Sequence, residues 1–249
     1  MELVAANAKE FKQAIEAIVN LVDEGTFEVS SKGLHLRAMD PSQIAMVDFL
    51  LPKEAFATFD ATEEITSLGI NIVDFSKILA RARSDEKLSI SLEEKANKFV
   101  LEFNGKSKRS FKIPLIEISA SAPREPKISF DATIKIKGGS LREMLKDAGL
   151  LSSHVVLQAH ESEFVVEAHG DSGDLKIEAK SGGESVEEVK ATTKSRAMFP
   201  FEYLDDITRA CPDDQAATIE LKSDSPIKVS YLVNQAKLSY YLAPRVEQA

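Results

Sequence analysis

The sequence predicts an α+β protein of two repeated domains, each built from antiparallel sheets and two helices. Its 249 residues suffice for two domains of roughly 120 residues, each able to bury its own core. Two apolar patterns alternate along the chain, a helical stripe with a spacing of three to four residues and a strand-like alternation. Both recur in the same order in the two halves, which indicates a duplicated unit.

The repeat is visible when the second half is aligned on the first. Residues 11–40 align without a gap on residues 141–170, so that Phe11 coincides with Leu141 and Ile15 with Leu145. Residues 70–82 then align on residues 198–210, and the closing segments of the two halves match as well. Chance rarely gives three blocks in the same order at a nearly constant separation, so we infer an internal duplication.

The helices are expected where the apolar residues follow helical spacing. Four of them are expected, two in each half, over residues 8–22, 73–83, 141–151 and 201–210. Asn7 precedes Glu10 by three residues, and Ser140 precedes Glu143 by the same distance. This spacing lets the first side chain satisfy free N–H groups at a helix start, so both pairs predict an N-terminal cap.

The strands are expected in the alternating segments between and after the helices. We place them over residues 26–29, 33–37, 45–51, 87–92, 98–103, 108–113, 155–159, 163–169 and 174–179. A segment of small residues with Pro123 and Pro126 separates the halves and suits an extended connector. The predicted domains are therefore residues 1–117 and 127–249, joined by a connector of residues 118–126.

The composition limits the classes of protein to which this chain can belong. The net charge of −9 argues against a generic nucleic-acid binder, so any DNA-related role requires a local basic face on an acidic body. Cys211 is the only cysteine, which excludes an internal disulfide and fits a reducing intracellular setting. The sequence shows neither a secretory signal nor an apolar run of the ~20 residues that would span a bilayer.

Catalytic and metal-binding signatures are absent from the sequence. The four histidines, His35, His154, His160 and His169, fit no zinc spacing, and Cys211 has no cysteine partner. The segment from Gly138 to Ser140 lacks the phosphate-binding frame and is interpreted as a loop at a helix start. We therefore predict no catalytic residue, no metal site and no cofactor.

Basic residues recur on the expected helices, on faces away from the apolar stripe. They lie three or four positions apart on three of the helices, with one more on the fourth: Lys9, Lys12, Lys77, Arg81, Arg142, Lys146 and Arg209. Acidic residues such as Glu10 and Asp147 share these helices. An ordinary solvated helix face accounts for such a pattern, so its role stays open at this point.

Three motifs carry a resemblance to a known family. They are the segments GLHLRAMDPS at residues 33–42, FKIPLI at residues 111–116 and LSYYLAPRVE at residues 238–247. Together they resemble the proliferating cell nuclear antigen family of sliding DNA clamps, in its archaeal form. The similarity extends over essentially the whole chain, and the first and last motifs are the specific ones.

The resemblance implies the DNA clamp fold assembled as a trimeric ring without catalytic activity. Such a ring encircles double-stranded DNA independently of sequence and acts as a processivity factor in DNA replication and repair. The residues implied to face DNA are the basic helix residues with one addition: Lys9, Lys12, Lys77, Arg81, Arg83, Arg142, Lys146 and Arg209. Contacts to phosphate carry no sequence information, so a ring held in this way can slide.

The resemblance also implies a pocket for short peptides of partner proteins. Its residues come from the first motif, a later loop and the ending: Met39, Ile44, Met46, Pro226, Ile227, Tyr241, Ala243 and Pro244. The partners implied are DNA polymerase, the clamp loader, flap endonuclease and DNA ligase. Ile118 in the connector and Ile116 just before it are the only apolar anchors there, which leaves the connector's own contacts to partners open.

The resemblance also implies a subunit interface between two strands, one from each domain. Residues 108–113 of one subunit would pair with residues 174–179 of the next, with charged residues at Lys108, Arg109, Lys112, Asp174 and Glu178. A location in the cytoplasm at the nucleoid follows, or in the nucleus of a eukaryote. Two alternatives stay open, a checkpoint-type clamp loaded at damaged DNA and an unrelated two-domain enzyme or ligand-binding protein. The choice between a homotrimer and a ring with paralogues also stays open.

Overall fold

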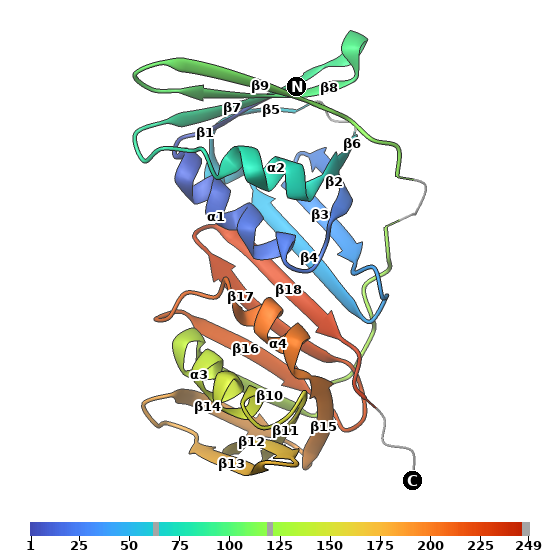
Figure 1. The fold of residues 1–249 in the computed structure, drawn as a ribbon, viewed down its shortest axis with the longest axis vertical. Helices are drawn as coiled ribbons and strands as arrows, with labels where there is room; N and C mark the ends of the chain where they lie inside the picture. Colours follow the sequence, from blue (N-terminus) through green and yellow to red (C-terminus); the bar gives the residue numbers. More distant parts are fainter. Residues whose placement is uncertain (62–64, 119–121, 246–249) are drawn as a thin grey trace. The chain divides into compact units, whose positions relative to one another are not determined.

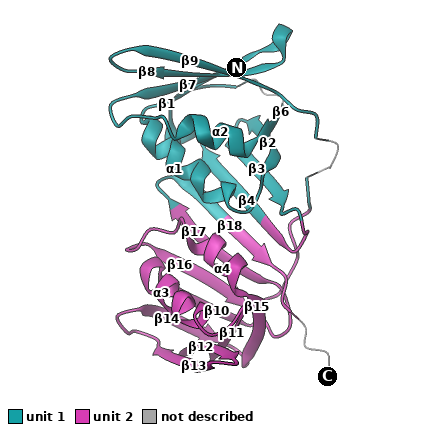
Figure 2. Cartoon of the chain, in the orientation of Figure 1, with its two compact units in different colours: residues 1–41, 47–123, 233–238 teal, residues 42–46, 124–232, 239–249 magenta. Residues whose placement is uncertain are grey.

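The computed structural model describes residues 1–61, 65–118 and 122–245 (Figure 1). The chain forms two compact units (Figure 2). Unit 1 contains residues 1–41, 47–123 and 233–238, and unit 2 contains residues 42–46, 124–232 and 239–249. Each unit is therefore built mainly from one half of the chain, with a short segment contributed by the other half.

Unit 1 holds two helices, two 3-10 turns and most of the first nine strands. Its elements are β1 (Glu2–Ala5), α1 (Ala8–Val19), β2 (Glu24–Ser30), β3 (Gly33–Met39), β4 (Ala45–Pro52), a 3-10 turn η1 (Lys53–Ala55), β5 (Phe56–Asp60), β6 (Thr66–Asn71), α2 (Ile72–Leu79), β7 (Lys87–Glu93), a second turn η2 (Glu94–Ala96), β8 (Lys98–Asn104) and β9 (Lys108–Pro114). The strands are hydrogen-bonded in the orders β5-β1-β7-β8-β9 and β6-β2-β3-β4.

Unit 2 repeats this plan. Its elements are β10 (Ala132–Lys137), α3 (Gly138–Gly149), β11 (His154–His160), β12 (Glu163–Gly170), β13 (Gly173–Lys180), β14 (Val186–Ala191), β15 (Ser195–Pro200), α4 (Phe201–Thr208), β16 (Ala216–Leu221), β17 (Ile227–Val233) and β18 (Ala236–Leu242). The strands are hydrogen-bonded in the orders β13-β12-β11-β15 and β14-β10-β16-β17-β18. The predicted fold class, two repeats of antiparallel strands with two helices each, is confirmed.

In each unit the two helices pack side by side against the strands (Figure 1). The core of unit 1 is aromatic, since Phe75 of α2 makes edge contacts with Phe11, Phe27 and Phe99. Tyr231 and Tyr240 stack in unit 2, and the buried Tyr231 hydroxyl donates to the carbonyl of Ile207 in α4 at 2.6 Å. This bond satisfies a phenol that would otherwise be costly to bury.

One of the two predicted helix caps is confirmed and the other is not. The Asn7 cap is confirmed, because its side-chain oxygen accepts from the N–H groups of Lys9 and Glu10. The Ser140 cap is wrong, because α3 begins at Gly138, two residues earlier. A Cβ at Gly138 would lie 2.4 Å from the Pro212 carbonyl oxygen, so only glycine lets the helix start this close to the neighbouring loop.

The helix ends also lie earlier than expected. α1 stops at Val19 and α2 at Leu79. After α2 the N–H groups of Arg81 and Ala82 donate three residues back instead of four, to the carbonyls of Ile78 and Leu79. This tighter turn takes Arg81 and Arg83 off the helix and into the connection to β7.

Candidate functional site

The basic residues of unit 1 lie on or just after its helices, and two of them pair with carboxylates on the same helix. Lys12 lies 3.2 Å from Glu16, and Lys77 lies 2.9 Å from Asp74. The side chain of Lys77 is 70% exposed, so its pairing is weak and easily exchanged for another anion. Lys9, Arg81 and Arg83 are also exposed.

The basic helix residues of unit 2 differ from one another in the carboxylates that surround them. Lys146 is exposed and pairs with Glu143 at 3.2 Å. Arg209 is exposed and lies 2.6 Å from Asp205 and 2.9 Å from Asp206. The α4 segment thus carries more acidic than basic groups, which leaves the stronger positive character in unit 1, at α2 and the turn that follows.

Arg142 has a structural environment. Its side chain is only 15% exposed and forms an ion pair with Asp213. It also donates to the carbonyl oxygens of Cys211 and Thr208, at the end of α4 and in the turn that follows. These contacts fasten α3 to that turn, and they leave Arg142 less available than the other cations to a ligand in solution.

The predicted peptide-pocket residues differ in accessibility. Met46, Ile227 and Tyr241 are 3%, 0% and 4% exposed. The remaining residues are half-buried: Met39, Ile44, Pro226, Ala243 and Pro244. In unit 2 the ending lies beside the segment after the first motif, since the Ala243 N–H donates to the Ile44 carbonyl at 2.8 Å. The structure thus brings Ile44 and Ala243 together, while Met39 belongs to unit 1.

The two strands expected at the subunit interface are both terminal in their sheets. β9 ends the five-stranded sheet of unit 1, and β13 ends the four-stranded sheet of unit 2. Within the described residues, neither strand has a strand partner on its outer side. Each therefore presents a row of backbone groups that a second chain could pair with.

The charged residues of these edge strands have partners within the chain. Lys108 pairs with Glu102 at 2.8 Å and Lys112 with Glu93 at 2.6 Å. On β13, Asp174 lies 2.8 Å from His169, and Glu178 pairs with Lys176. Any ion pair between the two strands of neighbouring subunits would therefore compete with pairs that each strand already makes.

Arg109 of β9 is held inside unit 1. Its guanidinium donates to both carboxylate oxygens of Glu86, at 2.7 and 2.5 Å, and to the Arg81 carbonyl at 3.0 Å. It also lies over the Phe103 ring, 4.9 Å from the centroid. Glu86 is 2% exposed and accepts in addition from the Arg83 N–H. This pair ties the turn after α2 to the edge strand.

Sequence reasoning missed the apolar residues near these edges. Leu150, at the end of α3, is 82% exposed. Phe111 of β9 and Leu175 and Ile177 of β13 are half-buried, and in both strands they alternate with polar or charged residues. The alternation of Leu175 and Ile177 with charged residues is visible in the sequence, but only the sheet order shows that it lies on an edge.

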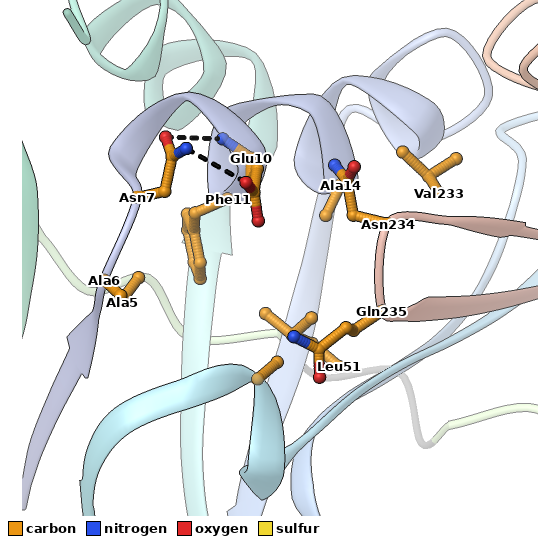
Figure 3. A pocket seen from close by; sticks show the side chains of 11 residues that line it. Ala5, Ala6, Asn7, Glu10, Phe11, Ala14, Leu51, Val233, Asn234 and Gln235 are labelled. Atoms are coloured by element: carbon orange, nitrogen blue, oxygen red, sulfur yellow. Dashed lines mark hydrogen bonds between the residues drawn. The ribbon is translucent and has the colours of Figure 1, made fainter. Parts of the chain in front are cut away.

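A small pocket of about 90 Å³ lies at the start of α1 (Figure 3). Its polar residues largely bond to one another or to nearby side chains: the Asn7 amide donates to Glu10 at 3.0 Å, and the Asn234 amide donates to Gln13 at 3.0 Å. Satisfied groups of this kind stabilise the helix start and the β17–β18 turn. We therefore interpret the pocket as structural.

Two histidines have shifted pKa values, and in opposite directions. His35 Nε2 lies 3.1 Å from Asp48, and hydrogen bonding to that carboxylate raises the pKa of His35 despite partial burial. Burial and the Arg245 charge lower the pKa of His154. Arg245 can only donate, so the His154 Nε2 at 2.8 Å must accept and is unprotonated in this contact.

The described residues contain no cluster of three histidine, cysteine or carboxylate side chains that could hold a metal ion. The Cys211 thiol is buried, and burial raises its pKa to about 11, which makes it a poor nucleophile.

None of the helices in the described part of the chain is long and apolar enough to cross a membrane. The accessible features of each unit are thus its exposed helix residues and open strand edges. Unit 2 also has an open groove, lined by residues 125–130, Glu220, Lys228 and Tyr241.

Comparison with known proteins identifies the family. The family model described as proliferating cell nuclear antigen, N-terminal domain, matches residues 1–122, and that for the C-terminal domain matches residues 124–246. The DNA polymerase sliding clamp of Methanococcus vannielii is 36% identical over 244 residues, 97% of each chain.

Solved structures agree with this result. The proliferating cell nuclear antigen of Thermococcus kodakaraensis has a TM-score of 0.91 at 26% identity, over 98% of this chain and 99% of that one. The A. fulgidus protein bound to the C-terminal region of FEN-1 has a TM-score of 0.89 at 25% identity, over 100% and 99%. The expected resemblance is confirmed, and the chain belongs to the proliferating cell nuclear antigen family.

Proposed function

We propose that this protein is a sliding DNA clamp, a ring that encircles duplex DNA and tethers replication and repair enzymes to it. The observation that carries the proposal is the match over the whole chain: both domain models fit, and the relatives named DNA polymerase sliding clamp align over 97% of their length. These names favour a replicative clamp over a checkpoint-type relative. The protein acts by holding its partners in place, without catalysis.

The ring is proposed to be a trimer closed by head-to-tail pairing of β9 with β13 of the next subunit. Both strands end their sheets, and a heterologous contact closes into a ring when its rotation permits. The exposed Leu150 and the half-buried Phe111 would supply apolar burial there. Lys108, Lys112, Asp174 and Glu178 would then have a secondary role, since they already have partners.

The cations proposed to face DNA are Lys9, Lys12, Lys77, Arg81, Arg83, Lys146 and Arg209, with Arg142 holding α3 in place behind them. Phosphate contacts of this kind are independent of sequence and depend strongly on salt. Partner peptides are proposed to bind at the residues around the ending, among them Ile44, Ala243 and Pro244. Polymerase, clamp loader, flap endonuclease and ligase are the proposed partners, in the cytoplasm at the nucleoid.

The proposal is tested with DNA circles and a cognate clamp loader. A clamp loaded onto nicked circular DNA is expected to co-elute with the circle in gel filtration and to dissociate after one restriction cut that leaves a free end. A protein bound by surface contacts alone would stay on the linear product, and that result would reject encirclement. The native mass, measured by light scattering, should be three times the 27.3 kDa of one chain.

A further inference from the structure

An open groove of about 450 Å³ lies on unit 2 near the proposed peptide site. Residues 125–130 form one wall, and Glu220, Lys228 and Tyr241 complete the lining. Tyr241, on β18, is 4% exposed. Lys228, on β17, has a side chain that is 23% exposed, whereas that of Glu125 is 49% exposed. The groove therefore combines three strand residues, among them Glu220 of β16, with the more exposed carboxylate of Glu125, which lies outside any strand.

The Glu125 carboxylate accepts a hydrogen bond from Tyr241 and forms an ion pair with Lys228. The Tyr241 hydroxyl donates to Glu125 Oε1 at 2.6 Å. The Lys228 ammonium lies 3.8 Å from the same oxygen and 3.6 Å from Glu220 Oε2. It also lies over the Tyr241 ring, 5.4 Å from the centroid. A phenol and an ammonium group thus converge on one carboxylate oxygen, a charge-assisted arrangement that selects an anion.

Glu125 and Tyr241 differ in what each loses when the hydrogen bond between them breaks. Glu125 is half exposed, so its carboxylate can return to water at small cost. The Tyr241 hydroxyl is fixed on a nearly buried ring and would lose this acceptor. A ligand that enters the groove, displaces Glu125 and brings an acceptor of its own restores the hydrogen bond from Tyr241, and the nearby Lys228 favours an acceptor with negative charge.

We propose that Tyr241 and Lys228 form a carboxylate-binding subsite within this groove of unit 2. Glu125 occupies the subsite when no partner peptide is bound. An acidic side chain of the partner peptide takes the place of Glu125 when the peptide binds. Glu125 is thus an internal competitor, and its removal strengthens binding. The inference rests on the proposed function, because it requires that partner peptides bind at this face.

The test measures binding of a synthetic peptide covering the C-terminal region of a flap endonuclease, by calorimetry at fixed salt. Glu125→Ala should bind the peptide about three- to tenfold more tightly than the unaltered protein, the range expected for one displaced hydrogen bond. The matched control is Glu117→Ala, which removes the same charge from an exposed residue near the start of the connector. It should leave the affinity unchanged.

A second arm identifies the group that replaces Glu125. Peptides in which each Asp or Glu is changed in turn to Asn or Gln are compared on Glu125→Ala and on Glu125→Ala/Tyr241→Phe. One of these changes should weaken binding about three- to tenfold on the first protein and have little effect on the second. Equal effects on both proteins would overturn the subsite, as would equal affinities for Glu125→Ala and Glu117→Ala.

The outcomes separate this inference from the function on which it rests. If the unaltered protein binds the peptide but Glu125→Ala binds it no better, only the subsite is rejected. If neither protein binds any of the peptides, the partner site of the proposed function is rejected, and the subsite with it. Hydrogen exchange at residues 124–130 should also be faster in Glu125→Ala; unchanged exchange would show that Glu125 does not hold this segment.

Discussion

Replacing Arg109 by methionine tests whether the pair with Glu86 holds the edge of unit 1 together. The substitution keeps most of the apolar side-chain volume but leaves a carboxylate that is 2% exposed without its main partner. Breaking a buried pair in this way costs about 3–5 kcal/mol. Because the Arg109 side chain is 20% exposed, we expect the lower end of the range, about 3 kcal/mol.

The adjacent residue provides a matched control. Lys108→Met removes the same charge from the same strand, but the Lys108 side chain is 62% exposed and its pair with Glu102 lies at the surface. Such pairs contribute about 0–1 kcal/mol, so this variant should lose less than about 0.5 kcal/mol.

The assay is urea unfolding at two fixed chain concentrations, since association shifts the apparent stability. A midpoint shift that is several times larger for Arg109→Met at both concentrations supports the reasoning. Equal shifts for the two variants would refute it. A loss for Arg109→Met that disappears at the lower concentration would instead place the role of Arg109 in subunit association.

Three further changes test other parts of the structure. His35→Gln should destabilise the fold more at about pH 5.5 than at about pH 8.5, because a raised pKa gives stability that is complete below the unfolded value of about 6.5 and is lost as the pH rises through the folded value. Gly69→Ala should release the start of the connector, because the new Cβ would lie 2.1 Å from the Ile116 carbonyl oxygen; faster hydrogen exchange at the Ile116 amide would report it. Charge reversal at Lys77 and Arg81 should reduce clamp-stimulated synthesis and flatten the salt dependence of DNA association, with a change in slope of up to ~0.9 for each phosphate that is no longer neutralised.

Each of these changes has a control within the chain. His154→Gln should show the opposite trend, because the lowered pKa of His154 makes the unaltered protein lose stability as the pH falls below about 6.5. Gly25→Ala would meet the Leu36 side chain instead of the connector, so it should destabilise unit 1 without freeing Ile116. Unchanged synthesis and salt dependence after reversal of Lys77 and Arg81 would mark their surface as an ordinary solvated face.

The sequence allowed the architecture to be predicted, because hydrophobic period and repetition are local signals. The paired helices and nine of the eighteen strands in the described residues followed from spacing alone, and the Asn7 cap followed from a motif of four residues. The start of α3 could not be predicted in the same way. It depends on the contact of Gly138 with Cys211 and Pro212, more than seventy residues away in the sequence.

The candidate site was less predictable, because a charged residue looks the same in sequence whether it faces solvent or a partner. Arg142 and Lys146 share one helix and one spacing, yet the first is held by the turn after α4 and the second is exposed. Arg109 was expected at a subunit contact, and its pair with Glu86 depends on how the turn after α2 folds back. Tyr241 and Met46 could be placed in the interior only from the packed strands.

Four of the exposed or partly exposed cations share an arrangement with a consequence for motion along DNA. Lys12, Lys77, Lys146 and Arg209 each have a carboxylate within one turn of their own helix. A phosphate that approaches such a cation competes with a neighbour that is always present, so the net gain from each phosphate is small. Releasing the phosphate costs equally little, because the carboxylate re-forms its pair. In the proposed ring, where these cations would line the hole, the energy profile from one base pair to the next would be nearly flat, with little friction against translocation.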